Sequence, residues 1–250
     1  MPPIIFYDIA SDKVGCWSAS TWKIRYALNY KGLPFQTIWV EYPDIEAKCK
    51  EIGAEPTGTR DGKPLYTFPV IHDPSTAHII SDSQKISQYL DEAYPDTPKL
   101  FPEGSQAKQT HIFKELVQNA PRWRLLVMPV MIHILNDASK PYFRTTREKM
   151  LGGKLEEVTP RGGERAATMN ALKATFTTFM ARLDESGRDT PYLLGAAPCY
   201  VDFVVASFLQ WVKLSMGEDG DVWTAIRELE DGRLIKYLED LSAYEGNPKA

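Results

Sequence analysis

The pattern of apolar residues changes once along this chain of 250 residues, and this change constrains the fold more than any other feature. The first ninety-odd residues alternate strand-like and helix-like segments. Prolines and glycines then gather at residues 95–98 and 101–104, a composition typical of linkers between domains. Beyond them, strand signals nearly vanish. We therefore predict one domain over residues 1–95, a linker over 96–104 and an all-helical domain over 105–250.

The first domain shows alternating signals for strands and helices. We expect strands over residues 4–9, 35–42, 65–72 and 78–80, and helices over 18–31, 45–52 and 82–94. The order is βαβαββα. The last two strands flank a turn-like Asp-Pro-Ser-Thr, which predicts an antiparallel hairpin on a mixed sheet.

The second domain has the spacing of amphipathic and buried helices. Residues 105–139 are helical in pattern, with an internal Pro129 that should kink or break the helix. Apolar residues between Met169 and Leu183 recur at spacings of three and four. Two further helices are expected over residues 200–215 and 234–241.

Composition excludes several classes of protein. The net charge of -4 provides no basic surface for nucleic acid. The longest apolar stretch, residues 200–212, is too short to span a membrane, and the start of the chain lacks the basic residues of a signal peptide. Three widely spaced cysteines fit neither a disulfide framework nor a zinc site. We expect reduced thiols in a cytoplasmic protein without a metal.

The segment Gly-Cys-Trp-Ser-Ala-Ser-Thr-Trp-Lys, residues 15–23, carries the first candidate site. It places Cys16, Ser18 and Ser20 where a strand leads into a helix. The N-terminus of a helix has unpaired N–H groups and a partial positive charge, which favour anions, including thiolates. Ser18 could donate a hydrogen bond to a bound thiolate, or it could only cap the helix. The segment alone favours the cap, and an isolated Cys16 is more often an inert small hydrophobe.

Two further segments could bind a peptide-like ligand. A cis bond before Pro69 would expose the backbone N–H and C=O of Phe68 for pairing, although the residues alone favour an ordinary trans proline at a strand edge. Ser81 and Gln84 have the spacing of a capping box. Within it, Asp82 could accept an ammonium group and Ser83 a carboxylate, or both residues could merely cap the helix.

A fourth segment, Pro198-Cys199-Tyr200-Val201-Asp202, precedes the most apolar helix of the chain. Asp202 lies three residues after Cys199, which is the spacing of a reciprocal cap. We expect Asp202 to act in folding rather than in catalysis.

Together these features resemble the glutathione transferases, whose second domain contains a buried Ser/Thr-x-x-Asp cap. The resemblance spans nearly the whole chain. Residues 15–18, 39–45 and 69–76 are, more narrowly, similar to the fungal-specific A class, which is itself similar to bacterial β-etherases that act on lignin-derived ethers.

The resemblance implies a thioredoxin-like first domain that binds glutathione as co-substrate. Pro69 would be the cis-proline, and the backbone of Phe68 would hold the cysteinyl group. Asp82 and Ser83 would hold the γ-glutamyl end. Ser18 stands at the position of the family's catalytic serine. Two departures concern this loop: Ala19 replaces a usual proline, and Ser20 replaces an asparagine or an aromatic residue, so that Ser20 could share or compete for the thiolate.

The implied activity is attack of the glutathione thiolate on hydrophobic, aromatic electrophiles such as lignin-derived compounds, with peroxidase or etherase-like reactions within its range. A homodimer is implied as well. Two alternatives stay open: a ligandin-type protein that binds aromatic molecules with little catalysis, and a thiol transferase that uses Cys16. From composition alone, the hydrophobic substrate would contact Trp123, Met128, Met131 and the aromatic pair at residues 142–143.

Overall fold

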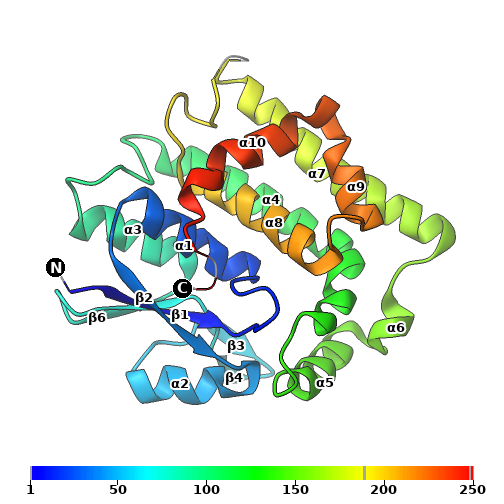
Figure 1. Ribbon diagram of the computed structural model, residues 1–250, viewed down its shortest axis with the longest axis horizontal. Helices are drawn as coiled ribbons and strands as arrows, with labels where there is room; N and C mark the ends of the chain where they lie inside the picture. The colour runs from blue at the N-terminus through cyan, green and yellow to red at the C-terminus, as the bar shows by residue number, and fades with distance from the viewer. Residues whose placement is uncertain (1, 188–189, 248, 250) are drawn as a thin grey trace.

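The computed structural model describes residues 2–187, 190–247 and 249, and its first part is a four-stranded mixed sheet with helices (Figure 1). The sheet has the strand order β2-β1-β5-β6, in which β1 runs parallel to β2 and antiparallel to β5. This confirms the predicted βαβαββα order and the antiparallel hairpin. The elements are β1 (Ile4–Ile9), α1 (Ala19–Tyr30), β2 (Phe35–Val40), α2 (Ile45–Ile52), β5 (Val70–Asp73), β6 (His78–Ser81) and α3 (Ser83–Ala93).

The local sequence explains these boundaries. β1 is central in the sheet, and its apolar run is almost entirely buried. α2 ends at Gly53, whose φ of 78° is left-handed, a conformation that glycine adopts without the steric cost that other residues have. The sequence prediction for α2 is therefore confirmed at both ends.

The predicted strand over residues 65–72 is wrong in its middle. Lys63–Leu65 forms β4, which pairs with the unpredicted β3 (Gly58–Arg60) in a separate two-stranded sheet, and β5 begins only at Val70. Pro69 lacks the N–H that a ladder needs, so the strand cannot pass through it. The Phe68–Pro69 peptide bond is cis, as the family resemblance implied and contrary to the trans bond that the residues alone favoured.

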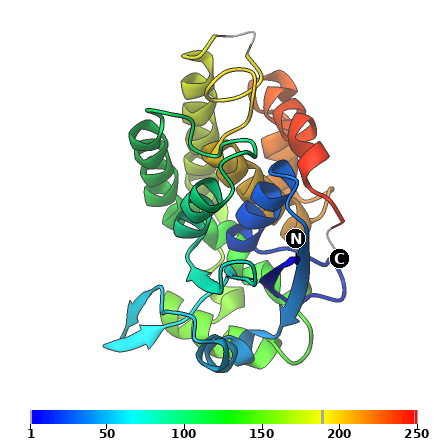
Figure 2. The ribbon, with the colours of Figure 1, turned by 90° about the vertical axis from the view of Figure 1, so that its left-hand side faces the viewer.

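The second part of the chain is helical (Figure 2). α4 ends at Val127, and Pro129 follows in a 3-10 segment, so the predicted break is confirmed. The helices α5, α6 and α9 were not predicted. The helices are α4 (Gln106–Val127), α5 (Lys140–Leu151), α6 (Leu155–Val158), α7 (Gly162–Asp184), α8 (Tyr200–Met216), α9 (Asp221–Arg227) and α10 (Arg233–Leu241), with short 3-10 segments at η1 (Tyr42–Asp44), η2 (Met128–His133), η3 (Leu229–Gly232) and η4 (Ser242–Tyr244).

α8 lies between α4 and α10, as the turned view in Figure 2 shows, and it packs against α1 of the first part. The rings of Tyr26 on α1 and Phe203 on α8 stack with centroids 5.5 Å apart. Asp202 lies in the first turn of α8 and forms the predicted reciprocal cap with Cys199: its carboxylate accepts hydrogen bonds from the N–H of Cys199 at 2.7 Å and of Leu193 at 3.0 Å. The hydroxyl of Tyr237 on α10 donates to the same carboxylate at 2.7 Å.

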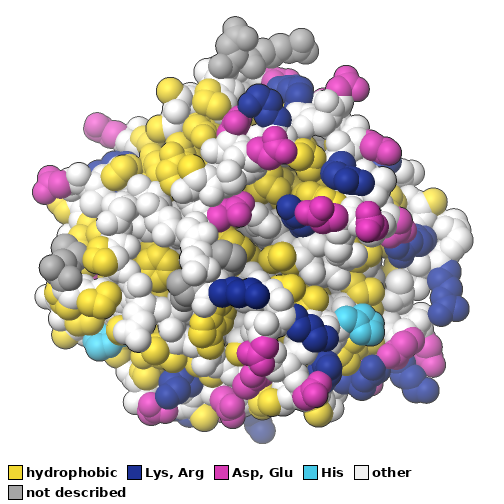
Figure 3. All heavy atoms as spheres, in the orientation of Figure 1, with side chains coloured by type: hydrophobic (Ala, Val, Ile, Leu, Met, Phe, Trp, Pro, Cys, Tyr) yellow, Lys and Arg dark blue, Asp and Glu magenta, His cyan; other side chains and the backbone are white. Residues whose placement is uncertain are grey.

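The surface drawn in Figure 3 intersperses acidic and basic side chains without a large area of one sign. Among the described residues, no helix is both long and apolar enough to cross a membrane.

Candidate functional site

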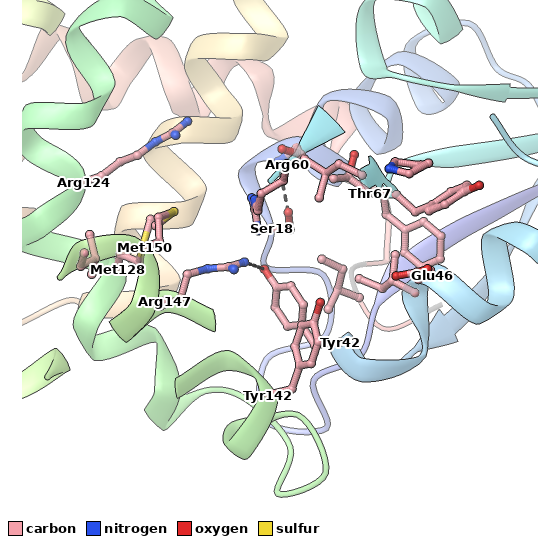
Figure 4. A pocket seen from close by; sticks show the side chains of 18 of the residues that line it. Ser18, Tyr42, Glu46, Arg60, Thr67, Arg124, Met128, Tyr142, Arg147 and Met150 are labelled. Carbon is pink, nitrogen blue, oxygen red and sulfur yellow. Dashed lines mark hydrogen bonds between the residues drawn. The ribbon is translucent and has the colours of Figure 1, made fainter. Parts of the chain in front are cut away.

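A cavity of about 610 Å³ lies between the two parts of the chain (Figure 4). A volume of this size is typical of sites for small ligands, about 300–1,000 Å³. One wall contains the start of α1 and the segment before β5, and the opposite wall contains residues of α4, η2 and α5. The cavity therefore exists only because the two parts pack together.

Ser18 lies in this cavity, at the N-cap of α1. Only 8 % of its surface is exposed, and its Oγ accepts a hydrogen bond from the N–H of Ser20 at 3.2 Å. Its hydroxyl hydrogen has no acceptor among the described residues. Ser18 is thus both a cap and a free donor, and the two functions that the sequence set against each other are compatible.

Ser20 also lines the cavity, but its side chain is exposed. Cys16 does not line it. The thiol of Cys16 is fully buried, and burial, reinforced by the charge of Asp8, raises its pKa well above the usual range. A thiol in such surroundings stays protonated and is a poor nucleophile. The geometry therefore disfavours the thiol transferase hypothesis.

Replacing Cys16 by serine is expected to leave turnover of glutathione with an electrophile within about twofold of the unmodified protein, a change in activation energy below about 0.5 kcal/mol. Stability should fall by about 1–2 kcal/mol, because a more polar hydroxyl is then buried. Steady-state kinetics and thermal melting check both results. The matched control is Cys49→Ser, which changes a buried thiol on α2. A more than tenfold loss of turnover in Cys16→Ser alone would restore the Cys16 mechanism.

The segment before β5 forms the neighbouring part of the cavity. Phe68 lines it, directly before the cis bond to the buried Pro69. Neither the N–H nor the C=O of Phe68 has a hydrogen-bond partner within the described part of the chain. These two groups are therefore available to an extended peptide ligand.

Asp82 and Ser83 lie at the start of α3 and are not among the side chains that line the cavity. The predicted Ser81–Gln84 capping box is wrong, because Asp82 is the N-cap and its Oδ1 accepts the N–H groups of Gln84 and Lys85. Asp82 has a φ of 78°, which costs a non-glycine residue on the order of 1–3 kcal/mol and is found mostly at functional sites.

The hydroxyl of Ser83 is already engaged, since it lies 3.0 Å from the hydroxyl of Tyr200 on α8. Its backbone N–H, at the first position of α3, has no hydrogen-bond partner among the described residues. This N–H is therefore available to a ligand carboxylate, and so is the Ser83 O–H when Tyr200 is the donor in the contact between the two hydroxyls.

The composition-based guess for the substrate wall is correct in part. Met128 and Tyr142 line the cavity, and Met131 lines a smaller adjoining cavity that shares Ser18. The prediction for Trp123 is wrong, because its side chain is fully buried and packs on aromatic rings of α7 and α8. Phe143 is also buried in the core.

Sequence reasoning missed the charged side chains of the cavity. Arg124 and Arg147 project from α4 and α5 toward it, and Arg60 lies on the opposite side (Figure 4). Tyr42 stacks on Tyr142 with ring centroids 6.1 Å apart. Each of the two arginines lies on a helical face that also contacts the core. A charged residue on such a face is the sequence signal that could have indicated them.

Sequence profiles of known families match both parts of the chain. The profile of the N-terminal domain of glutathione S-transferases matches residues 17–93, and that of their C-terminal domain matches residues 108–244. The chain belongs to the glutathione S-transferase family. The same conclusion follows from a glutathione S-transferase-like protein, ustS, of Aspergillus flavus, which is 34% identical over 244 residues, 92% of this chain and 86% of the relative.

Solved transferases of fungi share the fold of this transferase along its length. A glutathione S-transferase of Ceriporiopsis subvermispora, CsGST63524, crystallised with glutathione, superposes with a TM-score of 0.93 at 40% identity and covers 100% of both chains. The glutathione transferase GSTFuA3 of Phanerochaete chrysosporium superposes with a TM-score of 0.92 at 39% identity and covers 99% of both.

Proposed function

We propose that this transferase binds glutathione as its co-substrate and uses the Ser18 hydroxyl to hold the sulfur as a thiolate. The observation that carries this proposal is the free hydroxyl donor of Ser18, nearly buried in a cavity at the N-terminus of α1. A hydrogen bond to the anion and the field of the helix both favour the ionised thiol. Relatives crystallised with glutathione support the choice of ligand.

In this proposal, residues 1–95 bind glutathione. The backbone of Phe68, next to the cis bond to Pro69, pairs with the cysteinyl group. The free carboxylate oxygen of Asp82 and the N–H of Ser83 receive the γ-glutamyl end. Residues 105–250, joined by the linker 96–104, supply the wall that contacts the second substrate.

The second substrate is a hydrophobic, aromatic electrophile, because the wall contains Met128 and the stacked pair Tyr42 and Tyr142. We also propose that the chain is a member of the fungal-specific A class and that it assembles as a homodimer. Its reactions would include etherase-like or peroxidase reactions on lignin-derived compounds.

A titration of bound glutathione tests the proposal. We expect the ultraviolet absorbance of the thiolate to appear with a pKa about two units below the value of about 8.5 for a free thiol. The complex should also conjugate a neutral aromatic chloride. Bound glutathione that titrates like free glutathione would contradict the role of Ser18. Binding of aromatic molecules without turnover would favour the ligandin-type alternative.

A further inference from the structure

The wall that faces the second substrate is positively charged. Arg124 and Arg147 line both the main cavity and the smaller adjoining cavity that contains Ser18. Within the described ranges, no carboxylate lies within 4.0 Å of either guanidinium group, although salt bridges occur elsewhere in the chain. The acidic residue that lines the main cavity, Glu46, lies on α2 and pairs with Lys50 at 2.6 Å.

Arg147 is held in place by aromatic residues rather than by an acid. Its guanidinium carbon lies 5.3 Å from the ring centroid of Tyr42 and 5.2 Å from that of Phe143, within the range of cation–π contacts. Its Nη2 donates to the hydroxyl of Tyr42 at 3.3 Å. This arrangement orients the cation beside the cavity and leaves its charge uncompensated.

The side chain of Arg124 makes no hydrogen bond to any described residue, and it is partly buried. Burial lowers its pKa, and the nearby charge of Arg147 lowers it further. Two like charges at a partly buried site repel each other and lose hydration, and an anion between them relieves both costs. The charge of this wall therefore favours an anion beside the two arginines.

Glutathione is a poor candidate for this anion. Arg124 belongs to α4 and Arg147 to α5, whereas the Phe68 backbone and the start of α3 belong to the other part of the chain. The two arginines line the adjoining cavity together with Ser18, Met128 and Trp211. A molecule in contact with them lies on the side of the sulfur where the electrophile must approach.

We propose that the preferred electrophiles of this transferase are aromatic molecules that carry a carboxylate, which Arg124 and Arg147 bind. The inference rests on the proposed function and deepens it. With an aryl chloride, the sulfur forms a bond to the ring carbon that carries chlorine, and the C–Cl bond then breaks. Chloride leaves with the bonding electron pair, and the thiol proton has already passed to solvent.

A matched pair of electrophiles tests the inference: para-chloro-dinitrobenzoate and the corresponding benzamide, which differ in charge but share the reacting carbon. After subtraction of the uncatalysed rates, we expect kcat/KM of the unmodified protein to be at least about tenfold higher for the benzoate, because one charge-assisted hydrogen bond has an effect of this size. Added salt should reduce this preference.

Substitution of the arginines supplies the second readout. Arg124→Gln and Arg147→Gln should each lower kcat/KM for the benzoate about tenfold more than for the benzamide. Arg147→Lys should restore part of the preference, because it keeps the charge without the planar donor group. Lys149→Gln is the matched control, since Lys149 is an exposed cation on α5 that pairs with Asp61. It should change neither value.

The outcomes separate the two proposals. Equal values for benzoate and benzamide in the unmodified protein, or equal losses for both in the arginine variants, would overturn the carboxylate preference and leave the transferase function standing. No turnover of either electrophile, with bound glutathione that titrates like free glutathione, would overturn the proposed function and the inference with it.

Discussion

Replacing Ser18 by alanine is expected to lower kcat/KM for a neutral aromatic electrophile about 10- to 150-fold near neutral pH. In the proposed mechanism, the hydroxyl of Ser18, which lines the cavity, donates to the sulfur. A shift of two pKa units in bound glutathione corresponds to about 2.7 kcal/mol. A hydrogen bond to a charged group supplies about 1.5–3 kcal/mol of this, and the helix terminus about 0.3–1 kcal/mol. The variant keeps the helix and loses the larger contribution.

Two control variants separate catalysis from capping. Ser18→Gly retains most of the cap, since glycine costs an N-cap only a few tenths of a kcal/mol, but it loses the hydroxyl and should be as inactive as the alanine variant. Ser20→Ala removes the competing hydroxyl, and we expect a loss of less than about threefold, because the backbone N–H that Ser20 donates to Ser18 remains.

The pH dependence of Ser18→Ala provides a readout that a structural role would not move. Without the donor, the thiol of bound glutathione should ionise near its ordinary pKa of about 8.5. Turnover by the variant should therefore approach that of the unmodified protein as pH rises above this value. A deficit that is the same at every pH would contradict the assigned role of Ser18, as would full activity of the variant at neutral pH.

Replacing Asp202 by alanine is expected to lower the free energy of unfolding by about 3–5 kcal/mol, which corresponds to about 2–4 °C in Tm for each kcal/mol in a protein of this size. The carboxylate is fully buried and accepts hydrogen bonds from Cys199, Leu193 and Tyr237. Its removal leaves three buried donors without an acceptor. Thermal melting monitored by circular dichroism measures the change.

Two other variants calibrate the Asp202 result. Tyr237→Phe removes one of the three donors and should cost about 1.5–3 kcal/mol. Asp137→Ala removes an exposed carboxylate that pairs with Lys140, and it should lower Tm far less than Asp202→Ala does, because solvent screens an exposed ion pair. A loss for Asp202→Ala no larger than that for Asp137→Ala would show that the buried cap contributes little to stability.

The order and type of the four strands of the main sheet and of α1, α2 and α3 could be predicted from sequence because their patterns are local. Alternating apolar residues, Gly53 as a helix end and the hairpin turn act within a few residues of one another. The structure departs from these predictions where tertiary contacts decide: β3 and β4 pair with each other outside the main sheet, and α5 is too polar to show a strong period.

The candidate site shows the same division. Ser18 lies at a strand-to-helix boundary that the sequence marks. The cis Phe68–Pro69 bond lies inside a segment that was predicted as one continuous strand, and only the family resemblance implied it. Arg124 and Arg147 are far apart in sequence and become neighbours only when α4 and α5 face the same cavity. The prediction for Trp123 failed in the opposite direction, since it assigned a core residue to the cavity. An aromatic residue on α4 can face the core as readily as it can face a ligand.

Helix α1 contributes both to the candidate site and to the packing between the two domains, so a substitution in it affects both. Its first turn presents Ser18, and its buried face packs Tyr26 against Phe203 of α8. In the proposed mechanism, a substitution that moved this helix would disturb both the group that holds the sulfur and the junction between domains. α5 lies away from that junction, beside η1 and η2. Substitutions on the α5 side of the cavity can therefore change the lining of the cavity without moving α1.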